Sequence, residues 1–127
     1  MARPAATELT QRELEVMHVF WKRGALTANE ARDLLATQEI DRAYVTVANL
    51  VRILVDKGFL EQTNEERPFQ YRPIRAFQDV SRSLVKELVE RVFRGSREEL
   101  LVQLLGQKRL TVKERSMLEQ ILKEQDR

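Results

Sequence analysis

The sequence predicts a mainly α fold with a small β-hairpin wing, in which a winged helix-turn-helix domain (residues 1–74) precedes a C-terminal three-helix dimerisation region (residues 75–127). Three observations predict it. Capping motifs mark four helix starts, residues 42–73 read as a helix, a Lys-Gly stop and two short strands, and no strand pattern follows Pro73. The 127 residues allow one ordinary domain, or a small domain with a helical appendage, and no more.

Four segments begin with a Ser or Thr that is followed three residues later by Glu: Thr10 and Glu13, Thr27 and Glu30, Ser96 and Glu99, Thr111 and Glu114. This pattern predicts a capping box, whose two side chains bond to unpaired amides at a helix start. The first helix should run to Gly24, with an apolar stripe that contains Leu14, Met17 and Trp21. The second should run from Ala28 to about Ala36 and bury Ala31, Leu34 and Leu35.

The third helix should be capped by Asp41, and its apolar residues share one face: Val47, Leu50, Val51 and Leu54. The opposite face carries side chains that can hydrogen-bond to bases or phosphates: Arg42, Thr46, Asn49 and Arg52. Gly58 then allows a left-handed turn into a first strand, and a second strand ends at Pro73. Residues 64–68 form the wing tip. This order is typical of a winged helix-turn-helix and indicates DNA binding.

Residues 75–127 carry three short apolar stripes, which are too few to form a well-buried core alone. A second copy of the chain is the simplest partner, because a twofold interface pairs each stripe with its own equivalent. We expect the interface to contain Phe77, Leu84, Leu88, Leu101, Leu104, Leu118, Ile121 and Leu122. The alternative is a monomer in which these helices fold back on the N-terminal domain.

The composition, with 43% hydrophobic and 33% charged residues, is typical of a globular protein. No apolar run reaches the roughly 18 residues of a membrane span, and the N-terminus lacks a secretion signal, so we expect a cytoplasmic protein without direct membrane insertion. The net charge is +2, but residues 1–74 hold 10 basic and 11 acidic side chains. A DNA-facing patch must therefore be local, and its candidates are Arg42, Arg52, Lys57, Arg67 and Arg72.

Neither catalysis nor metal binding is predicted. The chain has no cysteine and one histidine, and its sequence contains no Gly-rich phosphate loop or recognisable nucleophile arrangement. His18 lies in an amphipathic helix without nearby carboxylate ligands, which favours a packing role. We expect no enzyme activity, no metal and no cofactor.

Several segments together resemble the penicillinase repressor family of the BlaI/MecI/CopY type: LTQRELEVMHVFWKRG, TVANLVRILVDKGFL, RPFQYRP, the break at residues 93–96 and the Leu-Thr helix start at residue 110. The resemblance implies a homodimeric transcriptional repressor whose third helix enters the major groove of an inverted-repeat operator. It also implies relief of repression by a membrane-linked sensor protease. The position matching the family's cleavage site is Gln103 and Leu104, without the usual Asn-Phe pair, and the tail cysteines of copper-responsive relatives are absent.

In this interpretation Val45, Thr46 and Asn49 face base edges, because asparagine can pair with adenine and methyl groups can contact thymine. Arg42, Arg52 and Arg67 bind phosphates, and Tyr44 packs at the helix start with its hydroxyl near a phosphate. For each arginine the alternative is a solvated face or a local ion pair.

Two departures from the family pattern concern DNA binding. Ile53 stands where many relatives have arginine, and Glu66 replaces a wing glycine, so that Glu65 and Glu66 place two carboxylates at the tip. The rival interpretation is a winged helix that binds another protein rather than DNA. The operator, the regulated genes and the inducing signal do not follow from the sequence.

Overall fold

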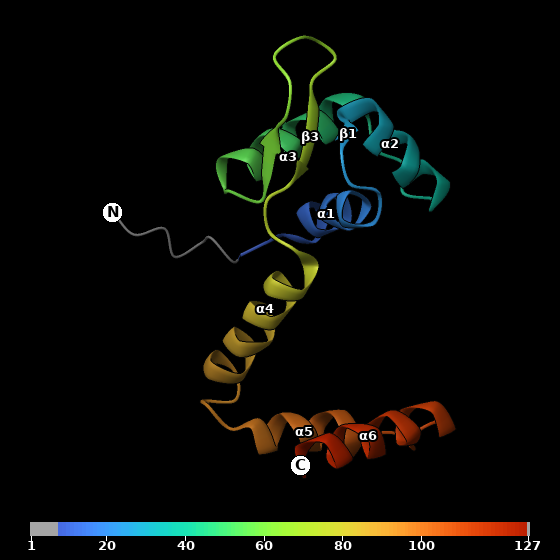
Figure 1. The fold of residues 1–127 in the computed structure, drawn as a ribbon, viewed down its shortest axis with the longest axis vertical. Helices are drawn as coiled ribbons and strands as arrows, with labels where there is room; N and C mark the ends of the chain where they lie inside the picture. The colour runs from blue at the N-terminus through green and yellow to red at the C-terminus, as the bar shows by residue number, and fades with distance from the viewer. Residues whose placement is uncertain (1–7, 127) are drawn as a thin grey trace. The chain divides into compact units, whose positions relative to one another are not determined.

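A computed structural model of the chain describes residues 8–126 (Figure 1). The helices and strands are, in chain order, α1 (Gln11–Arg23), β1 (Leu26–Thr27), α2 (Ala28–Thr37), α3 (Tyr44–Asp56), β2 (Leu60–Gln62), β3 (Gln70–Pro73), α4 (Phe77–Arg91), α5 (Arg97–Leu105) and α6 (Val112–Gln125). The mainly helical fold with a small β wing is confirmed. Within residues 8–126, no helix combines the length and the apolar character that a membrane crossing requires.

Capping residues determine where most of the helices begin. Both reciprocal bonds of the predicted capping box form at Thr10, Thr27 and Thr111, whereas Ser96 accepts a bond from the Glu99 N–H without the return bond. The predicted cap at Asp41 is wrong. Helical bonding starts at the carbonyl of Ala43, which accepts from the Val47 N–H at 3.1 Å, so the N-cap lies two residues after the expected one.

The sheet has three antiparallel strands in the order β1-β3-β2. Leu26 pairs with Tyr71 and Glu61 pairs with Arg72, so β3 lies between the other two strands. The predicted turn at Gly58 is confirmed, with φ of +86°. Its amide N–H donates to the Val55 carbonyl at 3.1 Å, which turns the chain from α3 towards β2. Strand β1 is too short for its alternation to be recognised in the sequence.

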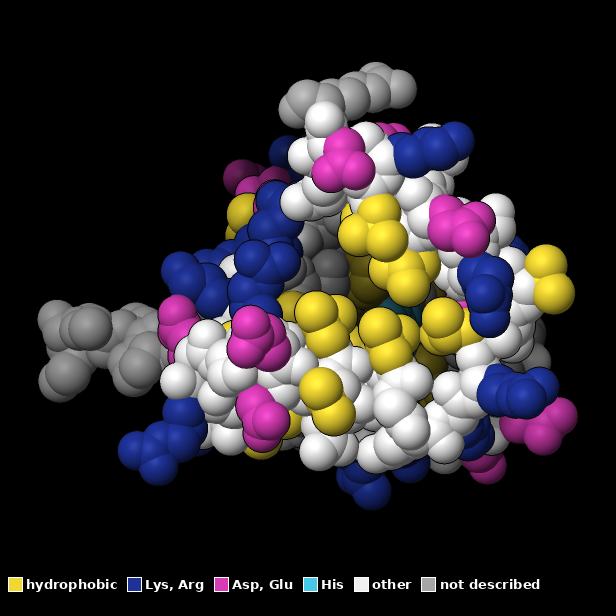
Figure 2. Space-filling view, turned by 90° about the horizontal axis from the view of Figure 1, so that it is seen from below, with side chains coloured by type: hydrophobic (Ala, Val, Ile, Leu, Met, Phe, Trp, Pro, Cys, Tyr) yellow, Lys and Arg dark blue, Asp and Glu magenta, His cyan; other side chains and the backbone are white. Residues whose placement is uncertain are grey.

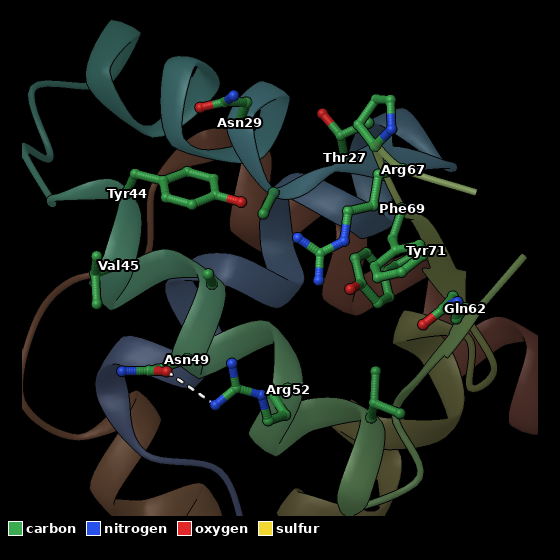
Figure 3. Close-up of a pocket in the computed structure, with 14 residues that line it drawn as sticks. Thr27, Asn29, Tyr44, Val45, Asn49, Arg52, Gln62, Arg67, Phe69 and Tyr71 are labelled. Atoms are coloured by element: carbon green, nitrogen blue, oxygen red, sulfur yellow. Dashed lines mark hydrogen bonds between the residues drawn. The ribbon is translucent and has the colours of Figure 1, made fainter. Parts of the chain in front are cut away.

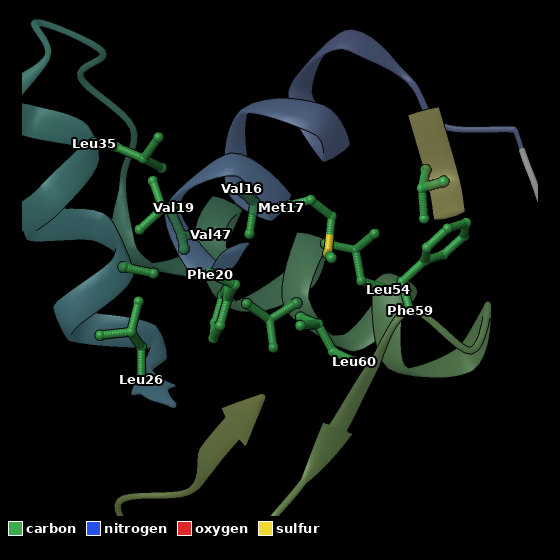
Figure 4. Packing of buried hydrophobic residues seen from close by; sticks show 13 residues of the cluster. Val16, Met17, Val19, Phe20, Leu26, Leu35, Val47, Leu54, Phe59 and Leu60 are labelled. Atoms are coloured by element: carbon green, nitrogen blue, oxygen red, sulfur yellow. The ribbon is translucent and has the colours of Figure 1, made fainter. Parts of the chain in front are cut away.

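The core lies where α1, α2 and α3 meet the start of the wing (Figure 4). Its largest fully buried side chains are Phe20, Phe59, Met17, Leu35, Leu54, Leu60, Val16, Val47 and Val51. Val80, in the first turn of α4, also belongs to this cluster. The described residues up to Leu84 form one compact unit, which includes the first part of α4.

A second compact unit begins at Val85 and contains the end of α4 with α5 and α6. Val89 is buried, but most large apolar side chains of this unit are exposed: Val85, Leu88, Val92, Leu101, Val102, Leu104, Leu105, Val112, Met117, Ile121 and Leu122. Apolar side chains gather on the face drawn in Figure 2, with basic and acidic side chains around them. The amphipathic stripes of the second unit thus remain largely open to solvent.

Candidate functional site

A hollow of about 890 Å³ lies in the first unit, between α3, the start of α2 and the wing formed by β2, β3 and their connection (Figure 3). We call it the α3–wing hollow. Ten of its lining side chains are labelled in the figure: Tyr44, Val45, Asn49 and Arg52 from α3, Gln62, Arg67, Phe69 and Tyr71 from the wing, and Thr27 and Asn29 around the start of α2. Polar and aromatic groups from three chain segments therefore converge on one open space.

The hollow is electropositive. Arg52 lines it from α3 and Arg67 from the wing, whereas none of the described residues that line it carries a carboxylate. The Arg52 Nη1 donates to Asn49 Oδ1 at 3.1 Å, and the Arg67 guanidinium lies over the Phe69 ring, 5.3 Å from its centroid. These two partners are neutral, so both positive charges remain available to an anion.

The other three basic candidates for the local patch pair with acids. Arg42 Nη2 lies 3.0 Å from Glu15 Oε1, Lys57 Nζ lies 2.8 Å from Glu13 Oε1, and Arg72 Nε lies 2.6 Å from Glu61 Oε2. The Arg42 side chain is only 25% exposed, and Arg42 does not line the hollow. Its pairing matches the alternative of a local ion pair.

The predicted base readers are placed differently from one another. Val45 and Asn49 are exposed and line the hollow together with Tyr44. Thr46 is half-buried and lies outside the lining. The structure thus brings together Tyr44, Val45, Asn49, Arg52 and Arg67, but not Arg42 or Thr46.

Sequence reasoning missed the contributions of α2 and of the wing strands. Thr27 caps α2 and Asn29 follows two residues later, so both lie at the helix end that faces the hollow. The capping box marks this end in the sequence, but its position beside α3 depends on how α2 packs. From the wing, Phe69 and Tyr71 both line the hollow.

The residues expected in a dimer interface fall into two groups. Phe77 and Leu84 belong to the first unit: the Phe77 ring lies 5.3 Å from Trp21 and 5.9 Å from His18, and Leu84 packs against the core. The others lie in the second unit and are exposed or half-buried: Leu88, Leu101, Leu104, Leu118, Ile121 and Leu122. Gln103 and Leu104, the expected proteolytic site, lie within α5.

Comparisons with known proteins show the family of this chain. The family model described as penicillinase repressor matches residues 9–124. The methicillin resistance regulatory protein MecI of Staphylococcus aureus (strain N315) is 25% identical over 115 residues, which are 91% of this chain and 93% of that protein. The penicillinase repressor of Bacillus licheniformis is 28% identical over 118 residues, which are 92% of this chain and 91% of that protein.

A solved structure supports the same family. The solution structure of the DNA-binding domain of the repressor BlaI superposes with a TM-score of 0.51 at 29% identity. The match covers 62% of this chain and 93% of that domain.

Proposed function

Because the chain belongs to the penicillinase repressor family, a family of DNA-binding repressors, we propose that it binds an inverted-repeat operator as a homodimer. In this proposal α3 enters the major groove, and the wing contacts the adjacent backbone. Each protomer reads one half-site, so the symmetry of the operator follows the twofold symmetry of the protein. The cytoplasm is the compartment in which such a repressor meets its DNA.

The main support for this proposal comes from the α3–wing hollow. Arg52 and Arg67 are its cationic side chains, and their neutral partners leave both charges for DNA phosphates. Asn49 and Val45 are exposed on α3 and can contact base edges, while the Tyr44 hydroxyl can donate to a phosphate. Thr46 and Arg42 are weaker candidates for contact with DNA, because Thr46 is half-buried and Arg42 already pairs with Glu15.

The exposed stripes of the second unit support the homodimer. Leu101, Ile121 and Leu122 are each about half exposed in the single chain, and burial of such side chains stabilises an interface. Phe77 and Leu84 already pack within the first unit, so we assign the main interface to α5, α6 and the end of α4.

Repression would be relieved by a membrane-linked sensor protease that cuts between Gln103 and Leu104. The Leu104 side chain is 64% exposed in the single chain, so a protease would reach it in a separated protomer or after the proposed interface opens. Because both residues lie inside α5, cleavage requires at least one helical turn to open. Incubation with the protease partner and mass spectrometry of the fragments would test the assignment, and intact chain would reject it.

The proposed function is tested on duplexes selected from a random pool, followed by fluorescence titration at several salt concentrations. We expect inverted-repeat sites and a negative salt slope. Arg52→Gln should reduce the steepness of the log–log slope by about 0.9, the value for one phosphate contact. Arg42→Gln is the matched control, and its slope should stay close to wild type because Arg42 pairs with Glu15.

The rival function is a winged helix that binds another protein. The net charge of −1 over residues 1–74 and the carboxylates of Glu65 and Glu66 at the wing tip favour it. A wild-type titration without salt dependence, and a pool without enriched duplexes, would support the rival and reject the repressor.

A further inference from the structure

The wing tip is organised around the side chain of Asn64. Its Nδ2 donates to the Glu66 carbonyl at 3.0 Å and to the Pro68 carbonyl at 3.1 Å. Its Oδ1 accepts from the Gln70 N–H at 2.8 Å. A single amide group thus bonds to three backbone groups, which span the connection from the end of β2 to the start of β3.

Arg67 lies between the two carbonyl groups that Asn64 holds. The bonds to Glu66 and Pro68 therefore restrain the backbone on both sides of this arginine. The guanidinium is restrained as well, because it lies over the ring of Phe69 beside the α3–wing hollow (Figure 3). Contacts therefore restrain Arg67 both at its neighbouring backbone and at its guanidinium.

We propose that Asn64 is a positioning residue for DNA binding, which holds the wing tip in the one conformation that directs Arg67 into the α3–wing hollow. The inference rests on the proposed function, since it assumes that Arg67 binds a phosphate. A wing that is already ordered before binding avoids the entropy cost of ordering a loop on the DNA. Asn64 need not contact DNA itself, and its loss should weaken the contact between Arg67 and phosphate.

The amide is the chemical group that this role requires. It supplies two N–H donors and an acceptor at once. Aspartate would keep the acceptor but turn a second oxygen towards the carbonyl groups of Glu66 and Pro68, and alanine would remove all three bonds. The bonds lie on an exposed tip outside the buried core, so their loss should leave the fold of the first unit intact.

The test is a double-mutant cycle with Asn64→Ala, Arg67→Gln and the double variant, measured on a selected duplex across a salt series. Each single change should weaken binding about tenfold and reduce the steepness of the salt slope by about 0.9. The double variant should bind no more weakly than Arg67→Gln alone, because Asn64 acts through Arg67. Amide hydrogen exchange at Gln70 should accelerate in Asn64→Ala.

Thr63→Val provides a matched control on the same connection. The Thr63 hydroxyl donates to the Gln70 carbonyl at a long 3.3 Å, and the Thr63 N–H donates to the same carbonyl at 2.8 Å, so the hydroxyl is redundant. This variant should bind DNA like wild type. Asn64→Ser serves as a second variant at the same position. Circular dichroism of Asn64→Ala and Asn64→Ser establishes that the first unit is folded in each.

Failure of the positioning role and failure of the proposed function give different results. Wild-type affinity in Asn64→Ala, or an equal loss on adding it to Arg67→Gln, would overturn the positioning role while the repressor proposal stands. A wild-type chain that shows no salt-dependent duplex binding would overturn both.

Discussion

The two units of this chain carry similar amphipathic helices but bury them to very different extents. In the first unit, Phe20 from α1, Leu35 from α2 and Leu54 from α3 are fully buried in one core cluster. In the second unit, Leu101 of α5 and Leu122 of α6 remain about half exposed. An apolar stripe shows that a helix needs a partner, but it does not show whether that partner lies in the same chain.

The difference has a thermodynamic meaning. Burial of apolar surface is the main favourable contribution to folding, so the first unit holds most of the stability that a single chain can have. The second unit gains its share only when another surface covers its stripes. Substitutions in the core of the first unit should therefore lower the free energy of unfolding, whereas substitutions in the stripes of the second unit should weaken association.

Phe20→Ala should give the largest loss of stability. The Phe20 side chain is fully buried, and its truncation leaves a cavity that lowers the free energy of unfolding by about 3–5 kcal/mol. Denaturant titration followed by the fluorescence of Trp21 reports on the first unit directly. Leu104→Ala in the second unit is the matched change, and an equal drop in the Trp21 transition for both variants would remove the distinction between the units.

Ile121→Asp should abolish association while leaving the first unit intact. A charge at the proposed interface would have to be buried without a partner, so the variant should sediment as a monomer. Loss of two-site binding should then weaken operator affinity by about a hundredfold or more. A variant that still sediments as a dimer would exclude Ile121 from the interface, and an altered Trp21 unfolding transition would show that its effect reaches the first unit.

Local signals in the sequence were sufficient for most of the fold. The Thr-Glu pairs at Thr10, Thr27 and Thr111 gave helix starts that match the structure, because a capping box depends only on residues three apart. Gly58 gave the end of α3 for a similar local reason. Strand β1 was missed because its two residues become a strand only through pairing with β3, far along the chain.

The site was less predictable, because a cation's role depends on the acids that folding brings to it. Arg42 and Arg52 look equivalent in the sequence, yet Arg42 meets Glu15, which is 27 positions away. Lys57 likewise meets Glu13, 44 positions away. No local pattern distinguishes these two from Arg52 and Arg67. The hollow itself could not be predicted, because α2, α3 and the wing form it only after packing.

Lys57→Met should reveal how much the Lys57–Glu13 ion pair contributes to the stability of the first unit. Glu13 is buried, with a side chain only 5% exposed, so removal of Lys57 leaves a carboxylate without its cation and should cost about 2 kcal/mol of unfolding free energy. Glu13→Gln added to Lys57→Met should recover part of the loss, because glutamine can still complete the capping box with Thr10. No recovery in the double variant would attribute the loss to the packing of Lys57 rather than to charge.

The smallest expected effect is the change in DNA affinity when one carboxylate is removed, tested once in each unit. Glu66 is exposed at the wing tip, where phosphates would repel it, so Glu66→Gln should tighten DNA binding about two- to threefold at about 0.1 M salt. Glu119→Gln makes the same charge change on α6 and should leave affinity unchanged, because the proposed DNA contacts belong to the first unit. Fluorescence titrations of both variants at two salt concentrations provide the measurement. Equal tightening by both would mean that net charge rather than the wing controls the affinity, and the functional distinction between the units would then fail at its most sensitive point.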